Sequence, residues 1–107
     1  MNNLKLLINI IMYGALNHFD NQRPVTEEVT QIANQMRYQI EAAMNTKFPV
    51  WEPTFFCQRY REGTDYRIKI KVGNDNNYIH VKIYKPENGR ELKLLTHVGG
   101  KVYHDPL

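Results

Sequence analysis

The spacing of apolar residues changes once along the chain, near Asn45. Before that point, apolar side chains recur at spacings of three, four and seven, which is typical of one buried stripe on an α-helix. Thr26 can cap the start of this helix, and Glu27 and Glu28 suit its first turn. Because the residue before a proline avoids the helical region, Phe48-Pro49 limits the helix on the other side. The stripe comprises Val29, Ile32, Ala33, Met36, Ile40, Ala43 and Met44.

These features predict an α-helix of about five turns that begins after Thr26 and ends near Asn45. Its apolar stripe faces a core, and its other side faces solvent. The residues expected on the exposed side are Asn34, Arg37, Gln39 and Glu41.

After Asn45 the apolar residues alternate with polar ones, which indicates β-strands. We expect strands at 55–60, 66–72 and 78–84, and a last strand that contains Leu92, Leu94 and Val98. Turn-forming residues at 73–77 and 86–89 separate the later runs. One helix followed by about four strands predicts an α+β fold, an antiparallel meander with one apolar face covered by the helix. The inward residues would be Tyr66, Ile68, Ile70, Val72, Ile79, Val81 and Ile83.

The opposite face of this sheet is basic. Arg67, Lys69 and Lys71 on one strand would lie near His80 and Lys82 on the next. Like charges on neighbouring strands destabilise a sheet unless solvent, acidic side chains or an anionic partner offset them. We interpret this face as solvated, with an acidic partner as the alternative.

Composition agrees with one globular domain spanning residues 1–107. Its 42% apolar and 23% charged residues suffice for one core, and the net charge of +3 does not by itself indicate nucleic-acid binding. The single cysteine, Cys57, excludes an intrachain disulfide and favours the cytoplasm. The apolar run 6–12 is too short to span a membrane. Residues 1–12 are interpreted as a strand or arm, with a weak secretion signal as the alternative.

No catalytic or metal-binding pattern is present in the sequence. Gly99-Gly100-Lys101 is too short for a phosphate loop, and Cys57 follows Phe55 and Phe56 in a predicted strand, where a packed thiol is expected. The four histidines lie far apart in the sequence and are expected at the surface. We therefore expect a protein that is not an enzyme and uses no cofactor or metal. The histidines are His18, His80, His97 and His104.

Three stretches of the sequence form a recognisable pattern: TQIANQMRYQIEAAMNTKFPVW, GTDYRIKIKVGNDNNYIHVKIYK and the ending HDPL. The chain resembles the stefin (type 1) branch of the cystatins from about residue 13 to residue 107. The resemblance implies a sheet wrapped around one long helix. It also implies a reversible inhibitor of papain-like cysteine proteases such as cathepsins, which occludes the protease cleft without reacting.

In that family a three-part wedge enters the cleft. The resemblance implies that the wedge here consists of an N-terminal segment around Gly14, a first hairpin at 58–63 and a second hairpin at 85–89. Residues 1–12 would be an unusual extension before Gly14. The implied protease-binding residues are Gly14, Gln58, Arg59, Tyr60, Arg61, Glu62, Gly63, Pro86, Glu87 and Asn88.

The first hairpin departs from the family pattern, whose tip is small and apolar. Arg59, Arg61 and Glu62 would have to lose water or find partners on binding, whereas Tyr60 could serve as an aromatic anchor. Inhibition weakened or redirected by this charged tip is one hypothesis. A cystatin fold that no longer inhibits and binds another, acidic partner is the other. We expect a monomer, with a domain-swapped dimer as a further option.

Overall fold

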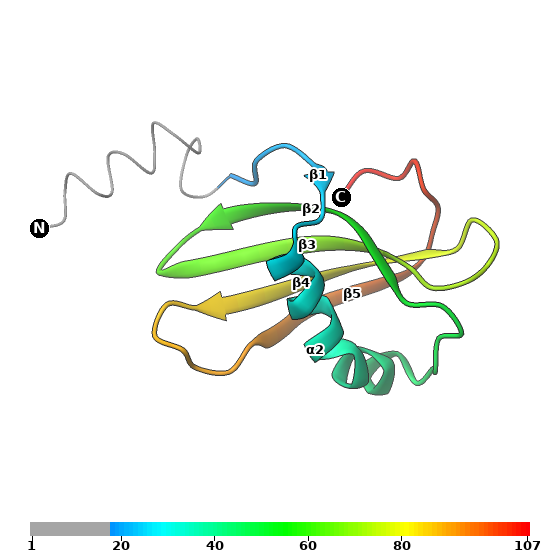
Figure 1. Ribbon diagram of the computed structural model, residues 1–107, viewed down its shortest axis with the longest axis horizontal. Coiled ribbons are helices and arrows are strands. Elements are labelled where there is room, and N and C mark those ends of the chain that lie inside the picture. Colours follow the sequence, from blue (N-terminus) through cyan, green and yellow to red (C-terminus); the bar gives the residue numbers. More distant parts are fainter. Residues whose placement is uncertain (1–17) are drawn as a thin grey trace, which may run out of the picture.

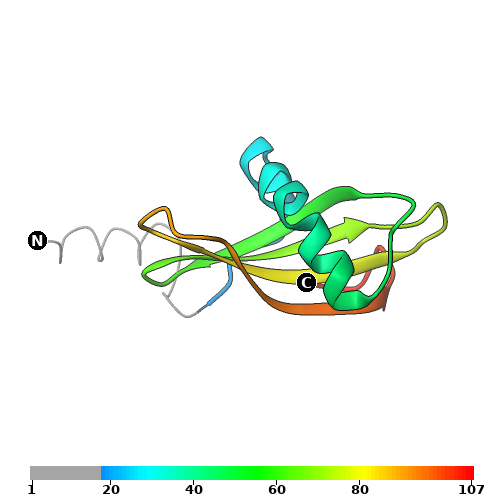
Figure 2. The same ribbon diagram turned by 90° about the horizontal axis from the view of Figure 1, so that it is seen from below.

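The computed structural model describes residues 18–107, which form one helix and a five-stranded antiparallel sheet. The strands follow one another across the sheet in chain order, and the helix crosses one face of it (Figures 1 and 2). The predicted α+β fold is therefore confirmed, with one short additional strand at the start. The elements are β1 (Arg23–Pro24), α2 (Glu27–Met44), β2 (Glu52–Tyr60), β3 (Gly63–Lys71), β4 (Tyr78–Pro86) and β5 (Lys93–Lys101).

Helix α2 begins and ends where the sequence predicts. The side chain of Thr26 accepts a hydrogen bond from the Val29 amide at 3.2 Å, which satisfies one of the free amides of the first turn. Asn45 closes the helix in the left-handed conformation, with φ of 52°, a role that asparagine tolerates better than most residues. The helix therefore has a defined length of 18 residues.

The core lies between the apolar stripe of α2 and the inner faces of β3 and β4. Every inward residue expected from β3 and β4 is buried, and five of the seven stripe residues of α2 are buried as well. Each such side chain contributes about 1.5–3 kcal/mol to folding. Met44 is only partly buried, and Ala43, which was expected in the core, is exposed.

Glu41 is also placed differently from the prediction, because it is buried and not on the exposed side of the helix. Its carboxylate accepts hydrogen bonds from the Phe48 amide at 3.0 Å and from Arg37 Nε at 3.1 Å. The Phe48 hydrogen bond, together with Arg37, holds the pKa of Glu41 below its ordinary value. Glu41 thereby fixes the segment that leads from α2 into β2.

The outer face of the sheet is partly covered, so its interpretation as a solvated face was wrong at Lys69. Lys69 is only 2% exposed, and its Nζ donates a hydrogen bond of 2.6 Å to the carbonyl oxygen of Tyr103 in the C-terminal tail. Tyr103 is anchored in turn by its amide, which donates to Asn76. Burial lowers the pKa of Lys69, and it also lowers the pKa of neighbouring His80 to about 4. His80 is half-buried and not the surface residue expected from the sequence.

Strand β5 contains Leu94 and Val98 as predicted, but Leu92 precedes it. The pairing with β4 shifts after Leu94: Ile83 pairs with Leu94, whereas Lys82 pairs with Thr96. This extra residue reverses the alternation. Leu94 therefore packs against the core, while Val98 is 47% exposed.

Candidate functional site

Two turns lie side by side at one end of the sheet (Figures 1 and 2). The first joins β2 to β3 and the second joins β4 to β5. Strands β3 and β4 are neighbours in the sheet, and Gly63 at the start of β3 pairs with Pro86 at the end of β4. The turn between β3 and β4 lies at the opposite end. Both hairpins named from the sequence therefore occupy a single edge of the molecule.

The segment before the helix also reaches this end of the sheet. The Asp20 amide donates to the Gln58 carbonyl oxygen at 2.9 Å, and the Gln58 amide donates to the Asp20 carboxylate at 2.9 Å. This pair of hydrogen bonds fixes the chain beside β2, close to the first turn. Gly14 and residues 1–12 lie outside the described residues, so the predicted role of Gly14 remains a prediction.

The tip of the first hairpin has an unusual backbone at its last two residues. Glu62 has φ of 31° and Gly63 has φ of 124°. A Cβ atom at Gly63 would lie 2.6 Å from the Lys85 carbonyl oxygen and 2.8 Å from the Tyr84 hydroxyl oxygen. Only glycine combines this conformation with this close approach. The tip is thus pressed directly against β4.

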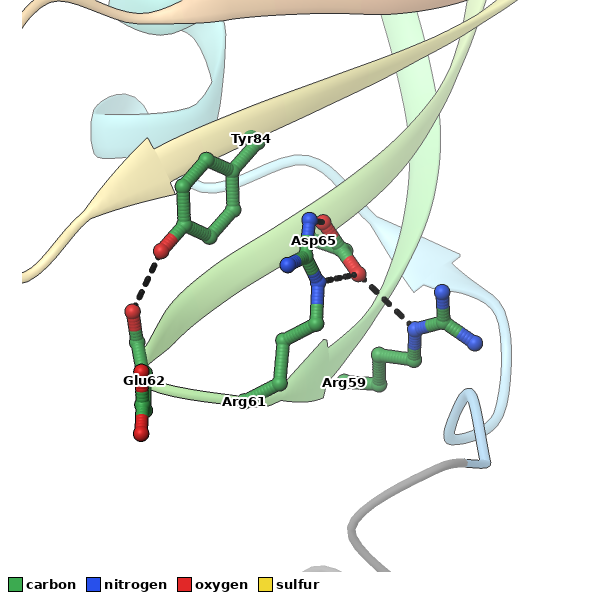
Figure 3. Close-up of polar contacts among 5 residues, drawn as sticks. All are labelled: Arg59, Arg61, Glu62, Asp65 and Tyr84. Carbon is green, nitrogen blue, oxygen red and sulfur yellow. Dashed lines mark hydrogen bonds and ion pairs between the residues drawn. The ribbon is translucent and has the colours of Figure 1, made fainter.

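Two tip arginines share one buried acceptor, Asp65 on β3 (Figure 3). Arg59 Nε and Arg61 Nε donate to the same carboxylate oxygen at 2.8 and 2.7 Å, and Arg61 Nη2 donates to the other at 3.0 Å. The Asp65 side chain is 0% exposed. Burial acts to raise its pKa, but the hydrogen bonds from Arg61 and Arg59 outweigh burial, and the pKa lies below its ordinary value. The same hydrogen bond raises the pKa of Arg61.

The charged tip therefore finds its partner inside its own chain. From the sequence, Arg59 and Arg61 were expected to need such a partner, but Asp65 was not named. Asp65 is the first acidic residue after the tip and lies on the same face of its strand as Arg67 and Lys69. Its pairing with Arg59 across β2 and β3 becomes visible only with the register.

The other residues of the first hairpin contact one another and β4. The side-chain nitrogen Nε2 of Gln58 donates a hydrogen bond of 2.9 Å to the Tyr60 hydroxyl oxygen, so these two side chains support each other along β2. The Tyr84 hydroxyl donates to the Glu62 carbonyl oxygen, which ties the turn to β4 (Figure 3). Arg61 lies over the Tyr84 ring, with its guanidinium carbon 4.2 Å from the ring centroid.

The second hairpin is attached at its start, where Lys85 Nζ forms an ion pair of 2.8 Å with Glu28 on α2, both side chains being partly exposed. Pro86 ends β4, and Glu87 and Asn88 in the turn are exposed. The one side-chain contact within this turn is a long hydrogen bond of 3.4 Å from the Arg90 amide to Asn88. A hollow separates the two hairpins, and its lining includes Glu62, Tyr84, Pro86, Glu87, Asn88, Arg90 and Lys93.

A cationic cluster lies on the outer face of the sheet behind the first hairpin. Arg59, Arg67 and Lys82 approach the ring of Phe19, with the charged groups 4.7, 3.9 and 5.6 Å from its centroid. Arg67 and Lys82 are direct partners across β3 and β4. Burial and then the charge of Arg59 lower the pKa of Lys82. Phe19, on the segment before the helix, thus covers cations of three strands, β2, β3 and β4.

The described part of the chain offers little for catalysis. Cys57 is buried, and burial raises the pKa of its thiol, which disfavours the reactive thiolate. No group of three or more metal-binding side chains occurs within residues 18–107. Within the same residues, no helix is both long and apolar enough to cross a membrane.

Comparisons with known proteins identify the family of the chain. A scan against models of protein families finds no match. Cystatin-B from Homo sapiens is 36% identical over 87 residues, which cover 79% of this chain and 88% of the relative. Stefin-C from Bos taurus is 31% identical over 99 residues, covering 90% of this chain and 97% of the relative. The chain belongs to the stefin-type cystatins.

A third relative has a name that states an activity. The leukocyte cysteine proteinase inhibitor 1 of Sus scrofa is 33% identical over 87 residues, which cover 79% of this chain and 84% of that inhibitor. The family resemblance predicted from the sequence is thereby confirmed. Membership in a family of stefins and proteinase inhibitors also agrees with the prediction that the chain is not an enzyme.

Proposed function

We propose that this stefin-type protein is a reversible inhibitor of papain-like cysteine proteases. It would act as a passive plug that occludes the active-site cleft with the segment around Gly14 and with the two hairpins. The observation that supports this proposal most is family membership over most of the chain, combined with two adjacent hairpin tips at one end of the sheet. A surface composed of neighbouring projections suits a cleft, because several contacts can exclude water together.

Within this plug each part has a different role. The first hairpin, from Gln58 to Gly63, is attached to β3 through Asp65 and to β4 through Tyr84 and would enter the cleft. Tyr60 would contribute an aromatic contact in a region where water is excluded. The exposed second hairpin, at Pro86, Glu87 and Asn88, would contact the rim of the cleft. Because the plug would cover the catalytic thiol by fit and form no covalent bond with it, inhibition would be reversible.

The decisive measurement is a titration of papain and of lysosomal cathepsins with the pure protein, in the presence of a fluorogenic peptide substrate. We expect inhibition that depends on the inhibitor concentration and is relieved by dilution. A second titration without residues 1–12 would measure the contribution of the extension. An absence of inhibition at tens of micromolar would overturn the proposed function.

A matched pair of variants would locate the contact surface. Tyr60→Ala changes the tip of the first hairpin, whereas Asp75→Ala changes the turn at the opposite end of the sheet. We expect Tyr60→Ala to weaken inhibition about tenfold or more, since truncated aromatic anchors have large effects. Asp75→Ala should leave inhibition unchanged. Equal effects of both variants would contradict this placement of the contact surface.

A second candidate function is supported by the cationic cluster around Phe19. A protein that has lost inhibition could use Arg67 and Lys82, which are like-charged partners on adjacent strands, to bind an acidic protein segment. Calorimetric titration with a polyglutamate peptide would test this function. Binding that disappears in Arg67→Gln/Lys82→Gln, together with no inhibition of papain, would favour it over the first proposal. Lys47→Gln on the exposed helix end is the control.

We further propose that the protein is a monomer. A domain-swapped dimer would require the first hairpin to open, and this would separate Arg59 from Asp65 across β2 and β3. Size-exclusion chromatography over a concentration series should therefore give one monomeric peak. A slowly exchanging dimer peak would indicate that the hairpin can act as a hinge.

A further inference from the structure

Asp65 has an environment that is unusual for a residue on the polar face of a strand. Asp65 is fully buried, whereas Arg67, the next residue on the same face of the strand, is partly exposed. Its two carboxylate oxygens accept three hydrogen bonds, all from Arg59 and Arg61. Removing one partner from such a buried pair leaves an uncompensated charge, and this is strongly destabilising.

The contacts of Asp65 reach the turn itself. Arg61 directly follows β2, and its guanidinium group grips both oxygens of Asp65 through two nitrogens. On the other side of the turn, the Tyr84 hydroxyl holds the Glu62 carbonyl oxygen. Figure 3 shows Arg61 between Asp65 and Tyr84, while Glu62 points away from both arginines. The turn is therefore attached to β3 and to β4.

This arrangement opposes the usual behaviour of a hairpin tip. Exposed loop tips are commonly the most mobile parts of a domain. A partner that binds a mobile tip must order it first, and that ordering reduces the affinity. A tip held by hydrogen bonds between Asp65 and two arginines has less freedom to lose on binding. In addition, three N–H groups of the two arginines already donate hydrogen bonds to Asp65 before any partner binds.

We propose that Asp65 is the positioning residue of the first hairpin: its one carboxylate pairs with Arg59 and Arg61 together and offsets one of their two charges before docking. The tip then enters a protease cleft as one ion-paired unit, and the protease need not supply carboxylates for the two arginines. This inference rests on the proposed inhibitory function. Asp65 itself does not touch the protease, since it lies beneath the side chains of the two arginines.

The test compares Asp65→Asn with a variant that also removes the two cations, Asp65→Asn/Arg59→Gln/Arg61→Gln. Asp65→Asn keeps the shape of the side chain and removes the charge that Arg59 and Arg61 share. We expect inhibition of papain to weaken by about 30-fold or more. The triple variant should recover most of this loss, to within about threefold of the wild type. Unchanged inhibition by Asp65→Asn would overturn the proposal.

Glu41→Gln is the matched control for a merely structural effect. Glu41 is a second buried carboxylate paired with an arginine, Arg37, but it lies at the C-terminal end of α2, away from the hairpins. We expect Glu41→Gln to lower the thermal unfolding temperature and to leave inhibition unchanged at a temperature where the variant stays folded. If both variants weakened inhibition in proportion to their loss of stability, Asp65 would have no positioning role.

Limited digestion by trypsin measures the mobility of the tip independently of papain inhibition. Trypsin cleaves after arginine only when the chain can adopt an extended, mobile conformation. Cleavage after Arg61, followed by mass spectrometry, should be about tenfold faster in Asp65→Asn than in the wild type, because the turn is released from β3. Equal rates would overturn the positioning role. A papain titration without inhibition, combined with faster cleavage, would instead reject only the proposed function.

Arg61→Lys provides a milder variant that keeps the charge and the trypsin site. Lysine cannot hold both carboxylate oxygens with a planar fork. We expect cleavage after residue 61 to become several-fold faster, while the pair between Arg59 and Asp65 keeps the protein folded. If Asp65→Asn does not fold, this variant carries the comparison. Unchanged cleavage in Arg61→Lys would then count against the proposal.

Discussion

The two hairpins at the same end of the sheet differ in how they are held. The first is fixed by side chains from two neighbouring strands, Asp65 on β3 and Tyr84 on β4. The second is held at its start by an ion pair between Lys85 and Glu28 on α2, whereas its exposed turn has a long side-chain hydrogen bond from the Arg90 amide to Asn88. Adjacent loops of one surface can thus combine a rigid element with an adaptable one. Under the proposed function, the first hairpin would enter the protease cleft with a fixed shape and the second would adapt to its rim.

The largest difference between the hairpins should appear at their glycines. Gly63→Ala places a methyl group 2.6 Å from the Lys85 carbonyl oxygen in a conformation that disfavours side chains. We expect a loss of about 2–4 kcal/mol in the free energy of unfolding. Gly89→Ala meets no atom within 4 Å, and its φ of 74° should reduce stability by only about 1 kcal/mol. Urea denaturation of both variants measures this contrast, and equal losses would contradict it.

Acid should loosen the first hairpin selectively. The pKa of Asp65 in the folded protein lies below its ordinary value of 3.8. The carboxylate therefore stabilises the fold fully above that value, and this stabilisation is lost as the pH falls through the lower folded pKa. Trypsin cannot be used in acid, so pepsin digestion between pH 4 and pH 2 is the suitable measurement. Cleavage near the first hairpin should increase over this range more than cleavage near the second.

A smaller difference is expected from single hydrogen bonds. Tyr84→Phe removes the hydroxyl that binds the Glu62 carbonyl oxygen and should lower the free energy of unfolding by about 1 kcal/mol. Asn88→Ala removes the weak contact of the second turn and should change it by less than about 0.5 kcal/mol. Thermal unfolding followed by circular dichroism can resolve the two. A larger effect for Asn88→Ala would reverse the comparison.

The periodic part of the fold could be predicted from the sequence, because its cause is local. A spacing of three and four places Val29, Ile32 and Met36 on one side of a helix in any context. Alternation does the same for Ile68 and Ile70 on β3. Both patterns appear in the structure where they were expected. The positions of the two hairpins followed from the same alternation and the turn residues between the strands.

Three buried charges could not be predicted, and they share one cause. Glu41, Asp65 and Lys69 are each covered by parts of the chain that the local pattern does not contain. The returning Phe48 segment covers Glu41, and the C-terminal tail covers Lys69. Two arginines from another strand and its turn cover Asp65. A charged residue on the polar face of a helix or strand looks exposed in the sequence. Only the strand register and the position of the tail show that other segments bury it.

Because Lys69 is buried, its amine should react only slowly with reagents in solution. A reagent that acylates lysine side chains should modify exposed Lys47 readily and Lys69 very slowly. Modification of Lys69 requires the C-terminal segment around Tyr103 to move away from the sheet, since the Tyr103 carbonyl oxygen accepts a hydrogen bond from Lys69 Nζ. The rate at which Lys69 is labelled would therefore report how often the C-terminal tail detaches from the sheet.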